Sequence, residues 1–210
     1  MKSFSVPAAV FCSLLVLLLL LTGCKRESAS PGQVTIGEQI WMTENLDVDH
    51  YRNGDRIPEA RSVAEWNAAI TKQEGAWCYS MNDQAGAGRK GRLYNWYAVS
   101  DLRGLAPMGW HVPDDREWSR LADHLGGAGV AGGRLRGSGA SASGFDLLFP
   151  GSRNCLGDFF GDGALAFFWS ATVSGPFEAW DREISLSDAR LGRVSVGKGL
   201  GLSVRCVKDN

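Results

Sequence analysis

The sequence lacks the residue patterns that most often carry catalytic or metal chemistry. It has only 3 histidines in 210 residues, and no two of them stand at a metal-ligand spacing such as i, i+4. It has no Cys-x-x-Cys and no Gly-x-Ser-x-Gly, which argues against a structural zinc site and a hydrolase nucleophile elbow. We therefore expect no metal, no cofactor and no enzyme of a familiar type.

An excess of charge of one sign is missing as well. The chain has 22 Lys and Arg against 23 Asp and Glu, so no basic surface for nucleic acid is expected. Its 44% hydrophobic and 21% charged residues are ordinary for one globular domain of this length. By contrast, 27 glycines and 8 tryptophans favour a loop-rich domain whose core depends on a few large aromatic side chains.

A long apolar run stands at the N-terminus. Lys2 supplies a positive charge, residues 6–21 are nearly all apolar, and Leu-Thr-Gly-Cys follows, ending at Cys24. The run is shorter than the ~20 residues that a bilayer span needs, so we predict a signal peptide rather than a retained helix. Leu-Thr-Gly-Cys resembles the bacterial lipobox, which implies cleavage before Cys24 and attachment of lipid to its thiol. We expect residues 1–23 to be the signal peptide and residues 24–33 a flexible polar tether.

A lipidated Cys24 would make the membrane itself the first partner of this protein, because two or three acyl chains anchor durably. The next residue is Lys25, not the aspartate that signals retention at an inner membrane. We therefore expect an extracytoplasmic lipoprotein at the outer membrane or cell surface.

Residues 34–210 are predicted to form one α+β domain. Capping boxes start helices at Ser62 and Asp114, each with a glutamate three residues later, and the first helix is expected over about residues 62–71. Residues 93–99 fit a helix or a strand. Residues 34–42 are predicted to form a hairpin or two short strands around Gly37. Strands are predicted at residues 167–172, 179–186 and 202–207, with strand and turn signals dominating from about residue 128.

Six segments resemble, in order, a bacterial domain family. They are residues 36–46, 51–55, 91–97, 109–118 (GWHVPDDREW), 168–172 and 203–207 (SVRCV). Together they resemble the Fibrobacter succinogenes major paralogous domain, often carried on extracytoplasmic lipoproteins. The family has no established function, so the resemblance implies a location and a fold. Parts of it look like formylglycine-generating enzymes, which implies a C-type-lectin-like fold with two short helices packed on twisted antiparallel sheets with long loops.

The resemblance also implies a disulfide. Cys78, Cys155 and Cys206 remain after signal cleavage, and three cysteines allow at most one internal bridge. Cys78 and Cys206 stand where family members often have cysteine, so they are the implied pair. Formylglycine-generating enzymes bind copper through two neighbouring cysteines, whereas Cys155 stands alone, so we do not expect that activity.

A set of residues in the second half is the candidate ligand-binding surface: Arg153, Asn154, Asp158, Trp169, Trp180 and Arg182. Tryptophan and arginine with a few acids suit a carbohydrate or peptide site, through stacking and forked hydrogen bonds. The alternative is that the tryptophans anchor the core and the arginines make structural ion pairs. Asp158 also lies in a loop that could hold Ca²⁺, although an ordinary turn is the simpler interpretation.

The second half also carries the acids Asp158, Asp162, Asp181 and Glu183, and an acid pair for glycoside hydrolysis would have to face across a cleft. We expect a non-enzymatic module that binds a polysaccharide, peptide or protein partner at the cell envelope. One alternative is an envelope enzyme of unrecognised type, which a cleft with perturbed ionisable groups would favour. The other is a structural component without ligand, which a contiguous apolar surface would favour.

Overall fold

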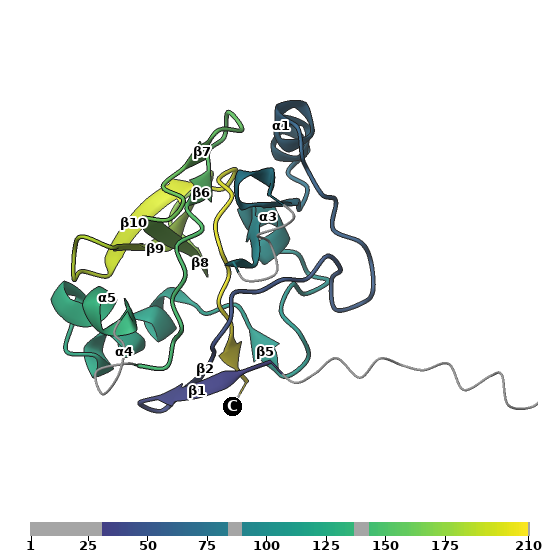
Figure 1. Ribbon diagram of the computed structural model, residues 1–210. Helices are drawn as coiled ribbons and strands as arrows, with labels where there is room; N and C mark the ends of the chain where they lie inside the picture. The colour runs from purple at the N-terminus through teal and green to yellow at the C-terminus, as the bar shows by residue number, and fades with distance from the viewer. Residues whose placement is uncertain (1–30, 84–89, 137–142, 210) are drawn as a thin grey trace, which may run out of the picture. The chain divides into compact units, whose positions relative to one another are not determined.

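The computed structural model of the protein describes residues 31–83, 90–136 and 143–209 (Figure 1). The signal segment, Cys24 and most of the tether lie outside these ranges, so their predictions stay predictions. Within the described ranges, no helix is both long enough and apolar enough to cross a bilayer.

The described chain is an α+β domain, as expected. Its helices are α1 (Val63–Lys72), α3 (Trp96–Val99), α4 (Asp115–His124) and α5 (Ala128–Arg136), with a 3₁₀ turn at Ser80–Asn82. Its strands are β1 (Gln33–Ile36), β2 (Gln39–Met42), β3 (Trp77–Tyr79), β4 (Arg92–Tyr94), β5 (Trp110–His111), β6 (Ser152–Arg153), β7 (Phe159–Phe160), β8 (Leu165–Val173), β9 (Glu178–Ser185), β10 (Gly192–Gly197) and β11 (Val207–Lys208).

The strands form small antiparallel sheets rather than one large sheet. One sheet has the order β1-β2-β11-β5, a second has the order β10-β9-β8, and β3-β4 and β6-β7 are two-stranded. The longest pairings belong to the second sheet, where β9 is the central strand (Figure 1). That sheet positions the candidate site described below.

The two predicted capping boxes are confirmed. The Ser62 hydroxyl accepts a hydrogen bond from the Glu65 amide, and the Asp114 carboxylate accepts one from the Glu117 amide at 2.7 Å. In both helices the glutamate side chain bonds back to the cap amide, which satisfies a second free donor. Helix α4 buries Trp118 and its neighbours against the core, as its apolar spacing predicted.

Four helices occur among the described residues, where we predicted two. The ambiguous stretch at 93–99 resolves into both forms: β4 ends at Tyr94, Asn95 caps the next turn, and α3 follows. Helix α5 was not predicted, because strand and turn signals were expected to dominate from about residue 128. Its sequence is a weak helix former because it contains three glycines. A Cβ at Gly132 would lie 2.1 Å from the Arg190 carbonyl oxygen, so close packing on a distant segment explains the glycine there.

The C-terminal segment also differs from its prediction. Alternation placed Arg205 on the face opposite Cys206, but residues 201–207 are all buried and only Val207–Lys208 pair as β11. The Arg205 guanidinium donates to the carbonyls of Met42 at 3.1 Å and Thr43 at 2.7 Å, and to Asn45 Oδ1. A buried arginine therefore joins the C-terminal segment to the loop after β2.

The aromatic core predicted from composition is present. Trp41, Trp66, Trp118 and Trp169 are all fully buried. The Trp41 and Trp118 rings lie 4.8 Å apart, so they join the β1-β2 sheet to α4. The buried residues form three clusters, with Trp41, Trp66 and Trp169 in different ones.

Candidate functional site

The predicted disulfide is wrong: Cys78, Cys155 and Cys206 are all free thiols. Cys78 packs under α1 with Trp66, whereas Cys206 belongs to a different hydrophobic cluster. Burial raises the pKa of Cys78 to about 11 and that of Cys206 to about 12. Both therefore serve as apolar core side chains, and family position did not reveal this.

Three of the six predicted ligand residues are buried in structural roles. Arg153 is 1% exposed, donates to the Ala60 and Gly157 carbonyls, and stacks on Trp66. Trp169 is fully buried and donates from its indole to the Tyr94 carbonyl at 2.7 Å. These contacts satisfy both side chains within the core, so neither can meet a ligand.

The other three predicted residues do not form a common surface either. Asn154 Oδ1 accepts from the Asp158 amide at 2.9 Å, which closes a local turn without any need for calcium. The Trp180 ring is covered by Arg193, whose guanidinium carbon lies 3.3 Å from the ring centre. The alternative we left open, core anchors and structural ion pairs, describes most of this set.

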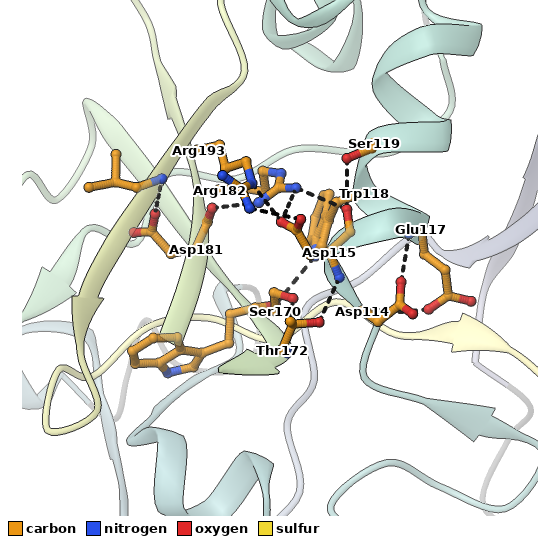
Figure 2. A network of polar contacts seen from close by, with 12 residues as sticks. Asp114, Asp115, Glu117, Trp118, Ser119, Ser170, Thr172, Asp181, Arg182 and Arg193 are labelled. Atoms are coloured by element: carbon orange, nitrogen blue, oxygen red, sulfur yellow. Dashed lines mark hydrogen bonds and ion pairs between the residues drawn. The ribbon is translucent and has the colours of Figure 1, made fainter. Parts of the chain in front are cut away.

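Arg182 belongs to a charged network between α4 and the central sheet (Figure 2). Its Nη2 donates to Asp115 Oδ1 at 2.7 Å, and Arg193 Nε donates to the same oxygen at 2.9 Å. Burial alone would raise the pKa of Asp115, but the hydrogen bonds from Arg193 and Arg182 outweigh it and hold that pKa below its usual range. We call these three residues the Asp115 network.

An open groove of about 610 Å³ lies against the β8-β9-β10 sheet, in the size range of ligand sites. Its apolar lining residues are Phe160, Leu165, Phe167, Ile184, Leu191 and Val194. Phe160 is 63% exposed and Val194 is also exposed, so part of this apolar wall faces solvent. No sequence pattern revealed the groove, because its lining comes from five separate segments of the chain.

Glu183 is the polar residue that distinguishes the groove. It lies on β9, opposite Phe167 of β8 on one side and Gly192 of β10 on the other. The Glu183 carboxylate has no hydrogen bond or ion pair within the described chain, and burial raises its pKa. The other lining acid, Asp188, is paired with Arg190 at 2.6 Å. Glu183 is thus a carboxylate in a partly apolar groove, and no cation of residues 31–83, 90–136 or 143–209 pairs with it.

Asp181 lies two residues before Glu183, on the same face of β9. It is 1% exposed, its Oδ1 accepts from the Val194 amide at 3.2 Å, and its Oδ2 has no partner in the described chain. Burial, and then the charge of Glu183, raise the pKa of Asp181 to about 7. The alternation of residues 179–186 was a signal for this acid pair, but no sequence pattern placed it beside a groove.

A second cleft of about 370 Å³ lies beside Trp77 and Arg92. Its aromatic surface is already occupied, because the Arg92 guanidinium lies 4.1 Å from the Trp77 ring centre. Arg92 is itself paired with Asp47 at 2.8 Å. Because the Trp77 ring and Arg92 are both used internally, this cleft is a weaker candidate than the groove, although Arg56 also lines it.

His111 has a structural role beside helix α4. It bridges Glu117 and Asp209 at 2.9 and 2.8 Å. Burial lowers its pKa, but the bonds to Glu117 and Asp209 outweigh it, so the net shift is upward. Among the described residues, no three His, Cys, Asp or Glu side chains gather into a potential metal site.

A family model, the Fibrobacter succinogenes major domain, matches residues 34–208. The chain belongs to this family. The match covers nearly all of the described domain, including the groove and the buried Arg205. Neither a curated protein nor a solved structure shows significant similarity to the chain. The α+β class is thus a property of this chain, and its C-type-lectin-like arrangement stays a prediction.

Proposed function

We propose that this protein is a lipid-anchored, extracytoplasmic binding module whose groove takes a polysaccharide, peptide or protein partner at the cell envelope. The observation that carries the proposal is the groove with its exposed aromatic wall and its unpartnered Glu183. Apolar walls with a few placed polar groups are the usual composition of a ligand site. The lipobox-like segment ending at Cys24 supports the location.

An envelope enzyme is the second candidate, and Asp181 is the observation in its favour. A carboxylate with a pKa of about 7 suits proton transfer at neutral pH. However, Asp181 is buried and does not line the groove, so a ligand there has no direct contact with it. We therefore favour binding over catalysis.

The first experiment tests location. The protein is isolated from its own host and analysed by mass spectrometry, together with a Cys24→Ser variant. We expect acyl groups on Cys24 and loss of residues 1–23 in the natural chain, and neither in the variant. An intact N-terminus with an unmodified thiol would refute the lipoprotein proposal.

The second experiment tests binding at the groove. The chain is applied to glycan arrays and to peptides from envelope digests, beside Phe160→Asp and Leu102→Asp. Both substitutions replace exposed apolar side chains, so both variants should fold, but only Phe160 lines the groove. We expect Phe160→Asp to lose binding by tenfold or more and Leu102→Asp to retain it. Equal binding by all three chains would place the site elsewhere.

A further inference from the structure

Resting on the proposed function, we infer that the groove recognises an extended peptide segment carrying an arginine or lysine side chain. The peptide would add to the open edge of β10, and its cation would bind Glu183. Three features of the described chain lead to this class of ligand: the unpaired carboxylate, the gap at Gly192, and the free edge of the sheet.

The carboxylate selects a cation. Glu183 lies between the Phe167 ring position and Gly192, and it lacks a protein counter-ion among the described residues. A ligand cation placed there would gain a charge-assisted hydrogen bond in a partly apolar setting, where such bonds are strongest. Guanidinium and ammonium groups also bind favourably beside aromatic rings such as Phe167 and Phe160.

The glycine leaves the route open. A Cβ at Gly192 would lie 3.2 Å from the Glu183 Cβ and 3.7 Å from its Oε2, so a side chain there would press on the Glu183 Cβ and cover one side of the carboxylate. No other residue of β10 stands opposite Glu183. The missing side chain thus connects the edge of the sheet to the carboxylate.

The sheet edge selects an extended peptide. Strand β10 pairs with β9 on one side and with no described strand on the other. Free backbone donors and acceptors on such an edge can pair with an added strand, while pockets read alternate side chains. A strand added beside β10 would lie two spacings from β9, about 9.6 Å. Long side chains such as arginine and lysine, together with that of Glu183, bridge this distance, whereas short polar side chains cannot.

The direct test uses the full chain, purified with its anchor in detergent, and fluorescent heptapeptides. The first peptide is Thr-Val-Thr-Arg-Thr-Val-Thr, and the second has citrulline, a neutral mimic, in place of arginine. We expect the arginine peptide to bind at least tenfold more tightly than the citrulline peptide, measured by fluorescence anisotropy. A third version with methylated amides along one edge should also bind more weakly, because it cannot pair with β10.

Protein variants locate the contact. Glu183→Gln should lose the preference for arginine over citrulline, and Gly192→Ala should weaken the arginine peptide while both carboxylates remain. The matched controls are Glu178→Gln and Gly197→Ala, at the other end of the same two strands and outside the groove lining. We expect neither control to change binding. A charge-exchange pair, Glu183→Lys with a glutamate peptide, should restore binding, which a merely structural role of Glu183 would not.

The outcomes separate the two proposals. If arginine and citrulline peptides bind alike, or Glu183→Gln behaves like Glu178→Gln, the cation inference is wrong. If a glycan or another partner binds in a Phe160-dependent manner and the peptides do not, this inference is wrong and the proposed function stands. If no partner of any class binds, the proposed function itself fails.

Discussion

The two faces of the β8-β9-β10 sheet treat acidic residues in opposite ways. On one face, Asp115 of α4 pairs with both Arg182 and Arg193, so each of these three side chains has an oppositely charged partner. On the other face, Asp181 and Glu183 come from the same strand and have no cation within ion-pair distance among the described residues. Strand β9 therefore contributes Arg182 to a stabilising ion pair on one face, and on the other face it carries two acids without an ion pair among the described residues.

Charged residues of the same strand differ in how much hydrogen-bonding capacity the fold leaves unused. Arg182 looked like a ligand-binding residue from sequence, yet its charge is used to join a helix to the sheet (Figure 2). Glu183, which carries no motif, is the side chain with unused bonding capacity next to a groove. Unused capacity in the folded state, rather than residue type, distinguishes the two faces.

The largest expected effect follows from removing the Asp115 carboxylate, which pairs with two arginines. Asp115→Ala leaves the buried Arg182 without its carboxylate, and removing one partner of such a pair costs about 3 kcal/mol. Urea denaturation should show this loss in the free energy of unfolding. The control is Asp188→Asn, whose partner Arg190 is exposed, and it should leave the midpoint unchanged. If the two variants are equally stable, the Asp115 network is not structural.

The second effect concerns Asp181, on the other face of the sheet. Asp181→Asn keeps the acceptor for the Val194 amide but removes a buried charge, so at pH 8 it should stabilise the fold by about 2 kcal/mol. The pKa shift corresponds to about 4 kcal/mol, and burial of an amide nitrogen in place of the unpartnered Oδ2 offsets part of it. The folded-state pKa is raised, so the folded state holds the proton more tightly than the unfolded state. The contribution of Asp181 to stability is therefore complete below about pH 4 and is lost as the pH rises to about 7.

A pH series of unfolding experiments checks the sign. The natural chain should lose stability between about pH 4 and pH 7 relative to Asp181→Asn, and the two curves should run parallel above pH 7. A natural chain that instead gains stability over this range relative to the variant would show that Asp181 has a compensating partner.

The smallest expected effect concerns Glu183, which is partly exposed. Glu183→Gln should stabilise the fold at pH 8 by less than about 1 kcal/mol, because solvent screens much of the cost of its charge. Because the pKa of Glu183 is raised in the folded state, fold stability and cation binding should depend on pH in opposite directions. As the pH rises from about 4.5, its contribution to stability falls, whereas affinity for the arginine peptide should rise as the carboxylate ionises. Anisotropy titrations at several pH values would refute this by showing constant affinity.

Other ionisable groups around the groove should not mimic this response. Asp188 and Arg190 pair with each other, and Arg193 pairs with Asp115. Asp181 titrates on the same face, so the affinity series should be repeated in Asp181→Asn. The rise in affinity should persist there if Glu183 is its source.

Local signals predicted the local structure well. Both capping boxes, the first hairpin around Gly37 and the long strands of the central sheet stand where the sequence put them. These features depend on neighbours within a few residues, which a sequence pattern records directly. The sequence did not predict helix α5, because its glycine-rich segment is a weak helix former. Residues 189–191, which are distant in sequence, pack closely against it and support the helix.

The candidate site could not be predicted in the same way. Of the six predicted ligand residues, Arg153, Trp169 and Arg182 are buried, because large and charged side chains also anchor loop-rich cores. The groove depends on Phe160, Phe167 and Val194 coming together from three strands. The sequence showed only the alternation around Glu183. That pattern assigns Glu183 to one face of a strand, but it does not identify the segments that pack against that face.

The sequence by itself determined the family, the α+β class, the starts of α1 and α4 and the aromatic character of the core, because each rests on composition or on contacts between near neighbours. Only the tertiary structure decided which charges are compensated, that the cysteines stay apart, and that Glu183 faces a groove beside an open strand edge. Those properties depend on distances between segments far apart in the chain, and no local pattern encodes such distances.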